Sequence, residues 1–366
     1  MESECASIHR TLRSNSGSCA SRGVALTRAP VFEQRSDPIV GRQVLIAENR
    51  AGRPNDFVAR EEAHGNPSAH LDCPFCAGHE NLTPEPLMEA VGADGLWQVR
   101  VVPNKFPAVA LAEPGCSPSG PQAVDARAIT PAGAHEVFVE SPHHVRDITQ
   151  LSAAELAICL RVYRDRLRYW ANDNRIGHVS IFKNVGVRAG ASLEHIHSQL
   201  VAFPHIPPLL TAELQSSQRY FSNHRRCIYC ALIEEELAHG QRLVHVGEGF
   251  VAFCAFAARQ PYETWIVPQH HAADYADLTD DQSEALARLL QRVVRAVQAE
   301  LTPLSYNLIL HTAPFRQPGE GDFNQYWHWH FELVPQSTQL AGFEWGTGMH
   351  INPLAPERAA ARLRLA

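Results

Sequence analysis

Apolar and polar positions follow a helical period in two runs of this chain, one in each half. The runs are ELAICLRVYRDRLRYW from Glu155 and SEALARLLQRVVRAVQ from Ser283, and their spacing is that of amphipathic helices. Each run follows a capping-box pattern, Ser152 to Glu155 in the first half and Thr279 to Gln282 in the second, which marks a helix start. The pattern therefore predicts one long helix in each half.

Short apolar runs bounded by turn residues surround both helices and predict strands. HVSIFKNV and HSQLVAF flank a glycine-containing connection, and LSYNLILHT and HWHFELVP flank a loop rich in proline and glycine. Such pairs are typical of neighbouring antiparallel strands. We therefore expect an α+β fold of two tandem units, each an antiparallel sheet with a packed helix.

The two halves repeat four chemical features in one order. Each contains a CxxC pair, a strand-like run that ends in two adjacent histidines, a helix, and a His-x-His motif within an apolar run. A shift of 127 residues aligns the middle portion without gaps and carries Glu136 onto Glu263. We interpret this order as an internal duplication, with chance similarity of two α+β halves as the alternative.

The length of 366 residues fits two domains and a tail better than one core. The polar residues 1–35, rich in Ser and Arg, predict a disordered tail. We expect an N-terminal catalytic unit at residues 36–205, a linker at residues 206–226 and a C-terminal unit at residues 227–366.

The net charge of −7 argues against broad binding to nucleic acid or to an acidic membrane. It leaves room for a local phosphate site. No run is apolar and long enough to span a bilayer, and the N-terminal region lacks the apolar core of a secretory signal. We therefore expect a cytoplasmic protein with neither a nucleic acid nor a membrane as partner.

Histidine is the enriched residue, with 20 of 366 positions. A CxxC turn lets two thiolates meet one ion, and two imidazoles complete a tetrahedral zinc shell. The available ligands are Cys73, Cys76, His195 and either His143 or His144, then Cys227, Cys230, His328 and either His270 or His271. Spacing does not choose between the adjacent histidines. Four protein ligands leave no open position, so both predicted zinc sites are structural.

His197 shares a strand face with His195 but does not occupy its metal position. A neutral imidazole is a good nucleophile toward phosphorus. The preceding segment FKNVGVRAGAS, with Asn184 and Ser192, offers donors for phosphate oxygens, and Gln199 continues the same face. The sequence thus indicates a nucleophilic His197 in a phosphate site, against the alternative of an ordinary half-buried strand histidine.

Several motifs resemble the galactose-1-phosphate uridylyltransferase family of the histidine-triad superfamily. They include DPIVGRQVLIAENRAGRP, CPFCAGHE, VVPNKFPAV, ESPHH, GASLEHIHSQ and AGFEWGTGMHINPLAPERAAARLR, and the resemblance begins at about Asp37. It implies a ping-pong transfer of UMP, or another nucleoside monophosphate, between a nucleotide-sugar and a hexose 1-phosphate. Between the two steps of this transfer the nucleotide would be bound covalently to the protein as a nucleotidylyl-histidine. Family members are usually homodimers, which is the assembly expected here.

Residue roles follow from this resemblance at matching positions. His197 would be the nucleophile, with Gln199 and Ser192 on the phosphoryl oxygens. The substrate-binding positions would be Arg50, Arg53, Asn104, Phe106, Asn184, Gly342 and Phe343, although surface charge is the alternative for the two arginines. The family's zinc ligands fall on Cys73, Cys76, His144 and His195. Gln199 replaces a histidine of related hydrolases, and an amide cannot shuttle a proton to water.

The sequence also departs from typical uridylyltransferases. Ile196 and Ser198 replace a Pro and a Gly, and the hexose-contacting Lys and Gln fall on Thr338 and His350. GFEWGTG and the second metal set resemble the plant ADP-glucose phosphorylase branch, which passes AMP to inorganic phosphate. That likeness places a second zinc on Cys227, Cys230, His271 and His328.

Three alternatives to the transferase remain open. The first is a nucleotide-sugar phosphorylase, and the second is a module held together by zinc that binds nucleic acid or protein. The third is metal redox chemistry at His311, His328 and His330.

Overall fold

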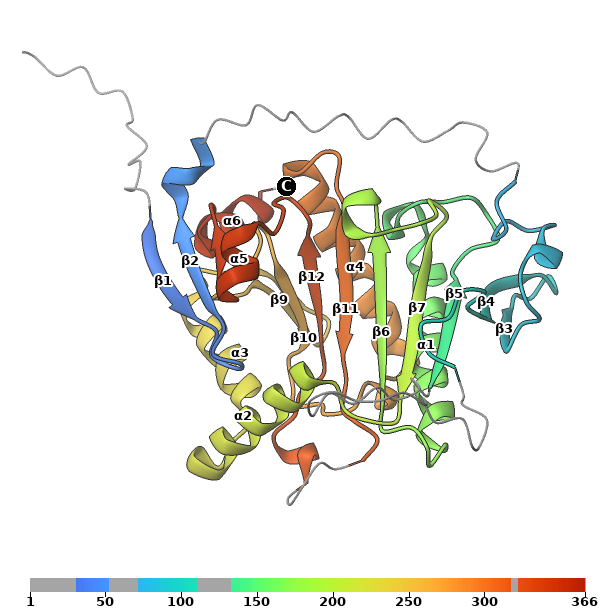
Figure 1. Cartoon of the computed structure of the whole chain (residues 1–366), viewed down its shortest axis with the longest axis horizontal. Helices are drawn as coiled ribbons and strands as arrows, with labels where there is room; N and C mark the ends of the chain where they lie inside the picture. Colours follow the sequence, from blue (N-terminus) through green and yellow to red (C-terminus); the bar gives the residue numbers. More distant parts are fainter. Residues whose placement is uncertain (1–30, 53–71, 111–132, 317–321, 366) are drawn as a thin grey trace, which may run out of the picture. The chain divides into compact units, whose positions relative to one another are not determined.

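Ten strands form one antiparallel sheet across the part of the chain that the computed structural model describes, residues 31–52, 72–110, 133–316 and 322–365 (Figure 1). Its order is β3-β4-β5-β7-β6-β11-β12-β10-β9-β8. The strands are β3 (Met88–Val91), β4 (Trp97–Pro103), β5 (Ala134–Val139), β6 (His178–Val185), β7 (His197–Phe203), β8 (Leu243–Gly247), β9 (Phe250–Cys254), β10 (Thr264–Pro268), β11 (Tyr306–His311) and β12 (His330–Pro335). With the helices below, this confirms the α+β class predicted from the sequence.

The strand order repeats between the halves. Counted from its outer edge toward the centre of the sheet, the first half runs β3-β4-β5-β7-β6 and the second runs β8-β9-β10-β12-β11, so each half is a five-stranded sheet with its last two strands exchanged. The halves join edge to edge where β6 pairs antiparallel with β11, in a register that sets Val185 opposite Tyr306. This topology is what an internal duplication produces, and the join removes one exposed edge from each half.

One long helix from each half covers one face of the sheet. These are α1 (Ala153–Ala171) and α4 (Asp280–Glu300), which pack against each other (Figure 1). Both begin at the predicted capping boxes: Glu155 N–H donates to Ser152 Oγ at 3.2 Å, and Gln282 N–H donates to Thr279 Oγ1 at 3.2 Å. The sequence prediction of both helix starts is confirmed, and their apolar faces share one hydrophobic core with the sheet.

The opposite face of the sheet differs between the halves. In the second half it is covered by α2 (Pro208–His224) and α3 (Ile228–His239), which pack on Val251 and Phe253 of β9. In the first half the corresponding cluster is small: Val102, Val137 and Val139, with Phe75 and Trp97 packed at its side. This part of the first half is therefore where the fold leaves space for a ligand.

Smaller elements complete the described chain. They are the sheet of β1 (Phe32–Ser36), β2 (Gln43–Ala47) and β13 (His350–Asn352), and the helices α5 (Gly342–Thr347) and α6 (Pro356–Leu363). The predicted tail lies outside the described residues up to residue 30, and its last residues belong to β1. The predicted linker, residues 206–226, contains α2. None of the described helices is apolar over enough length to cross a bilayer.

Candidate active site and metal centres

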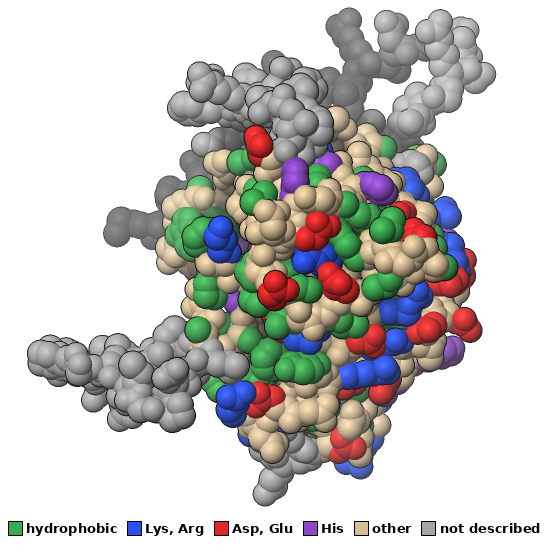
Figure 2. Space-filling model, turned by 90° about the vertical axis from the view of Figure 1, so that its right-hand side faces the viewer, with side chains coloured by type: hydrophobic (Ala, Val, Ile, Leu, Met, Phe, Trp, Pro, Cys, Tyr) green, Lys and Arg blue, Asp and Glu red, His purple; other side chains and the backbone are tan. Residues whose placement is uncertain are grey.

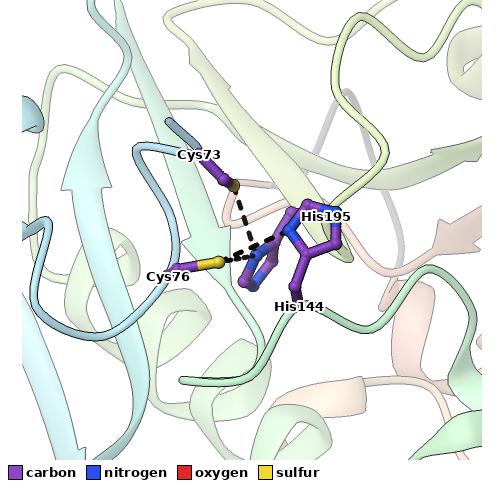
Figure 3. A group of neighbouring side chains, drawn as sticks. All are labelled: Cys73, Cys76, His144 and His195. Atoms are coloured by element: carbon purple, nitrogen blue, oxygen red, sulfur yellow. Dashed lines mark hydrogen bonds between the residues drawn. The ribbon is translucent and has the colours of Figure 1, made fainter. Parts of the chain in front are cut away.

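The first CxxC pair meets two histidines that are distant in the sequence (Figure 3). Cys73 Sγ lies 3.5 Å from His195 Nδ1, and Cys76 Sγ lies 3.4 Å from His144 Nδ1 and 3.6 Å from His195 Nδ1. A tetrahedral zinc ion with ordinary bond lengths separates a sulfur and a nitrogen ligand by about 3.5 Å. These four side chains therefore fit one zinc ion, and the geometry brings His144 rather than His143 into the group.

Contacts around the four side chains set their ligand atoms. His195 Nε2–H donates to the Ser141 carbonyl at 2.9 Å, which leaves the Nδ1 lone pair facing the thiols. Burial lowers the pKa of His195 to about 4, so its ring is neutral at pH 7. Burial and the neighbouring Cys73 raise the pKa of Cys76 to about 11, a barrier to ionisation that a bound cation removes.

The second half repeats this arrangement with Cys227, Cys230, His271 and His328. Cys230 Sγ lies 3.3 Å from His271 Nδ1 and 3.7 Å from His328 Nδ1. The other ring nitrogens donate to backbone carbonyls, His271 to Asn324 at 2.7 Å and His328 to Pro268 at 3.1 Å. The donor set and its outer contacts again suit a structural zinc ion.

A third group of possible ligands, His311, His330 and Glu332, lies within the second half. His311 Nδ1 is 3.3 Å from Glu213, and His311 Nε2 is 3.4 Å from Glu332. Burial alone would lower the pKa of His311, but these two carboxylates raise it to about 10. At neutral pH the ring is therefore an imidazolium in a buried ion triad. His328, which the redox hypothesis included, lies in the second CxxC group instead.

His197 begins β7, and its ring lies beside Phe75 with 5.5 Å between centroids. Its Nδ1 lies 2.8 Å from the His195 carbonyl, which can only accept, so Nδ1 carries the proton and Nε2 is left with a lone pair. Burial lowers the pKa of His197 below its ordinary range. At neutral pH this imidazole is uncharged and suited to act as a nucleophile.

A cavity of about 680 Å³ opens at His197, a volume within the usual range for small-molecule sites. Five of the predicted site residues line it: Asn104, Phe106, Ser192, His197 and Gln199. Phe106 is 83% exposed, so its ring is available to a ligand. The walls combine apolar groups with amides, the hydroxyls of Thr83 and Ser192, one lysine and one aspartate. Apolar walls with amide, hydroxyl and lysine donors suit a nucleoside joined to phosphate groups.

Other predicted positions do not line this cavity. Asn184 lies on β6, whose register with β7 sets Phe182 opposite Gln199 and thus brings Asn184 level with His197. Arg50 is exposed in a 3₁₀ turn after β2, and Gly342 and Phe343 are exposed in α5. Arg53 lies outside the described residues.

Sequence reasoning missed several groups around His197. Lys105 and Phe75 line the cavity, and each belongs to a motif that already carried a predicted residue, NKF and CPFC. Behind the strand, buried Lys183 pairs with Glu140, which also accepts from the Tyr163 hydroxyl. Lys183 Nζ–H donates to the His197 carbonyl at 3.2 Å. The signal for this network in the sequence is that Lys183 shares the buried strand face of Val179 and Ile181.

Sequence comparison matches both halves of the chain to one family. The N-terminal domain of galactose-1-phosphate uridyl transferase matches residues 25–207, and the C-terminal domain matches residues 213–365. The chain is similar to the ADP-glucose phosphorylase of Arabidopsis thaliana, at 32% identity over 91% of this chain and 92% of that protein. It is also similar to the galactose-1-phosphate uridylyltransferase of Thermotoga maritima, at 26% identity over 91% and 98%.

Solved structures agree with these matches. The crystal structure of the Arabidopsis thaliana ADP-glucose phosphorylase with bound ADP-glucose superposes with a TM-score of 0.77 at 30% identity, covering 92% of this chain and 99% of that one. A uridylyltransferase structure gives a TM-score of 0.68 at 29% identity, over 91% and 98%. The domain matches, the relatives and the duplicated sheet lead to one conclusion: this chain is a member of the galactose-1-phosphate uridylyltransferase family.

Proposed function

We propose that this protein is a nucleotidylyltransferase that moves a nucleoside monophosphate from a nucleotide-sugar to a phosphate acceptor through a covalent adduct on His197. The observation that carries the proposal is the state of this ring. The ring is neutral, its Nδ1 proton is donated to a backbone carbonyl, and His197 lines a cavity that also contains amides, hydroxyls and an exposed aromatic ring.

The chemistry proceeds in two displacements. His197 Nε2 attacks the α-phosphorus, the bond to the oxygen that bridges to the sugar-bearing phosphate breaks, and sugar 1-phosphate leaves with the electron pair. The ring is then an imidazolium, and its Nδ1–H donates to the His195 carbonyl throughout. An oxygen of the acceptor phosphate next attacks the same phosphorus, the nitrogen–phosphorus bond breaks, and neutral His197 returns.

Gln199 supports transfer to a phosphate acceptor instead of water. It lies on the same strand face as His197 and lines the same cavity. An amide can donate to a phosphoryl oxygen but cannot take a proton from water. The adduct therefore persists until an acceptor that is already ionised arrives.

The acceptor is a hexose 1-phosphate in the uridylyltransferase form of this proposal, with UDP-sugar as donor. A phosphorylase that uses inorganic phosphate is the second candidate. The observation in its favour is the 32% identity to an ADP-glucose phosphorylase over nearly the whole of both chains.

We propose zinc at the two CxxC groups, in agreement with their sulfur–nitrogen spacings. A zinc ion there would crosslink distant segments of the chain. It would not act as a Lewis acid on a substrate, because four protein ligands leave no open position. In the first group it would fix the segment that begins β7, and with it the position of His197. Metal analysis of the purified protein should give two zinc ions per chain, and one or none would contradict this assignment.

We further propose a cytoplasmic homodimer. Metal-binding thiols persist in a reducing compartment. On α5, Phe343 is 37% exposed and Trp345 is 76% exposed, and neighbouring exposed apolar side chains often mark a contact with another protein chain. Sedimentation of the full chain and of a Trp345→Ser variant tests the assembly, and a monomeric wild-type protein would refute it.

Intact-mass spectrometry of the protein after mixing with UDP-, ADP- and GDP-sugars tests the central proposal. The wild-type protein should gain one nucleotide on His197, and the base that labels it identifies the donor. His197→Ala protein should gain none, while His143→Ala, a change at an exposed neighbour outside the metal group, should leave labelling normal. Label retained on His197→Ala protein would refute the assignment.

The two acceptors are separated by a second incubation. Labelled protein is freed of donor and given either inorganic phosphate or hexose 1-phosphates. Release of nucleoside diphosphate by phosphate alone indicates a phosphorylase, and release of a new nucleotide-sugar indicates a transferase.

A further inference from the structure

His135 lies on β5 at the edge of the cavity, between the loop that carries Asn104 and Phe106 and the side chain of Gln199. Its Nδ1 accepts from the Ala108 backbone N–H at 3.1 Å. Its Nε2 lies 2.9 Å from Gln199 Oε1. This imidazole thus contacts a side chain of the proposed phosphate site.

The backbone contact settles which nitrogen of His135 carries the proton. A backbone N–H can only donate, so Nδ1 must be the acceptor, and a neutral imidazole then carries its hydrogen on Nε2. Asn104 Nδ2 also lies 3.0 Å from Nε2, but its NH₂ group can only donate, and a protonated Nε2 has no lone pair to accept from it; Asn104 Oδ1 accepts from the Phe106 N–H at 2.8 Å. The Nε2 proton is therefore donated to Gln199 Oε1.

This donation decides how the Gln199 amide is turned. With its oxygen held by His135, its NH₂ group is the part left for the cavity beside His197. The opposite orientation would present an oxygen to the negatively charged phosphoryl group. A donor fixed before the reaction stabilises the transition state without reorganisation.

We propose that His135 is a positioning residue for nucleotidylyl transfer: it holds the Gln199 amide so that its NH₂ group donates to the α-phosphoryl oxygen. This inference rests on the proposed function at His197. Removal of one oxyanion donor typically slows an enzyme by about 10²–10³-fold. Loss of its orientation alone is expected to slow adduct formation by roughly tenfold or more, with little change in nucleotide-sugar affinity.

Two isosteric substitutions separate this role from simple support of the neighbouring loop. His135→Gln keeps a donor near the Nε2 position, and His135→Asn keeps an acceptor near the Nδ1 position for Ala108. If His135 orients Gln199, the rate of adduct formation in a single turnover should survive in His135→Gln and fall in His135→Asn and His135→Ala. The dissociation constant for the nucleotide-sugar should stay within about threefold in all three. A rate that survives in His135→Asn, or a loss confined to affinity, would overturn the proposal.

A double substitution tests whether His135 acts through Gln199. In a Gln199→Ala background, His135→Ala should cause no further loss of rate, whereas an equal loss in both backgrounds would refute the coupling.

Nitrogen NMR of histidine-labelled protein gives a readout that needs no turnover. The His135 ring, assigned by its absence from the His135→Gln spectrum, should carry its proton on Nε2, and a proton on Nδ1 would overturn the inference. Absence of any adduct on wild-type protein contradicts the proposed function instead.

Discussion

The buried pair of Lys183 and Glu140 gives a quantitative test of the framework behind His197. Lys183 is 2% exposed and Glu140 is 1% exposed, so neither charge has water to solvate it. Each charge is therefore stabilised mainly by the other. In addition, Glu140 accepts a hydrogen bond from the Tyr163 hydroxyl, and Lys183 donates one to the His197 carbonyl. Replacement of Lys183 by Met removes the cation, keeps the length of the chain and leaves an uncompensated buried carboxylate.

Removal of one partner of such a pair typically costs about 3–5 kcal/mol of stability. Replacement of both partners by neutral residues of similar size costs far less and can be neutral. Lys183→Met should therefore lower the free energy of unfolding by about 3–5 kcal/mol. The double variant Glu140→Gln with Lys183→Met should recover most of that loss, because the amide oxygen introduced at position 140 can still accept from the Tyr163 hydroxyl.

Urea unfolding of the metal-loaded protein at pH 7, followed by tryptophan fluorescence, measures these differences. Lys105→Met is the matched control, because Lys105 is the only other lysine in the sequence and is exposed. It should change the free energy of unfolding by no more than about 0.5 kcal/mol. A loss of less than about 1 kcal/mol in Lys183→Met, or a double variant no more stable than the single one, would refute the dependence of Glu140 on Lys183.

The first metal group, the buried His311 and the cavity beside His197 can each be tested by one substitution. Cys73→Ser should lower zinc from two ions to one per chain and lower the melting temperature, whereas an unchanged zinc content would contradict the first site. Glu213 and Glu332 raise the pKa of His311 to about 10. The stability that its positive charge contributes is therefore fully present below about pH 6.5 and is lost as the pH rises toward 10. The free energy of unfolding should fall more steeply from pH 7 to 10 in the wild-type protein than in His311→Asn protein. Phe106→Ala should weaken nucleotide-sugar binding about tenfold through lost base stacking, and an unchanged dissociation constant would refute its place in the pocket.

The duplicated plan could be predicted because its signals are local. The capping boxes at Ser152 and Thr279 and the helical apolar spacing depend on residues three or four apart, and both helices begin where expected. The CxxC pairs and the strand histidines recur at matching positions in the halves. These signals were sufficient for the fold class and for the groups of possible metal ligands, but spacing alone did not choose between adjacent histidines.

The contacts that join distant segments could not be predicted in this way. Nothing in the apolar pattern of β6 or β11 specifies that these two strands pair and make one sheet of the two halves. The contact between His135 and Gln199 spans 64 residues, and that between Glu140 and Lys183 spans 43. Each is fixed by strand register, which a single sequence does not reveal. On the face shown in Figure 2, basic and acidic side chains lie interspersed with each other and with apolar ones, as expected of a protein that does not bind nucleic acid broadly through its surface charge.

The two halves share a fold but differ at the second histidine of the His-x-His motif, which lines a cavity in the first half and is buried in the second. His330 is the counterpart of His197, yet its ring is stacked on Trp265 at 4.9 Å and on His311 at 4.5 Å between centroids, and it is 1% exposed. Burial and the neighbouring His311 lower the pKa of His330 to about 3. Aromatic rings under α2 and α3 thus fill the space that the first half leaves open beside Phe75. Large side chains therefore occupy the position in the second half that matches the cavity beside His197, and for this reason our proposal places the nucleophile in the first half and assigns sheet and core to the second.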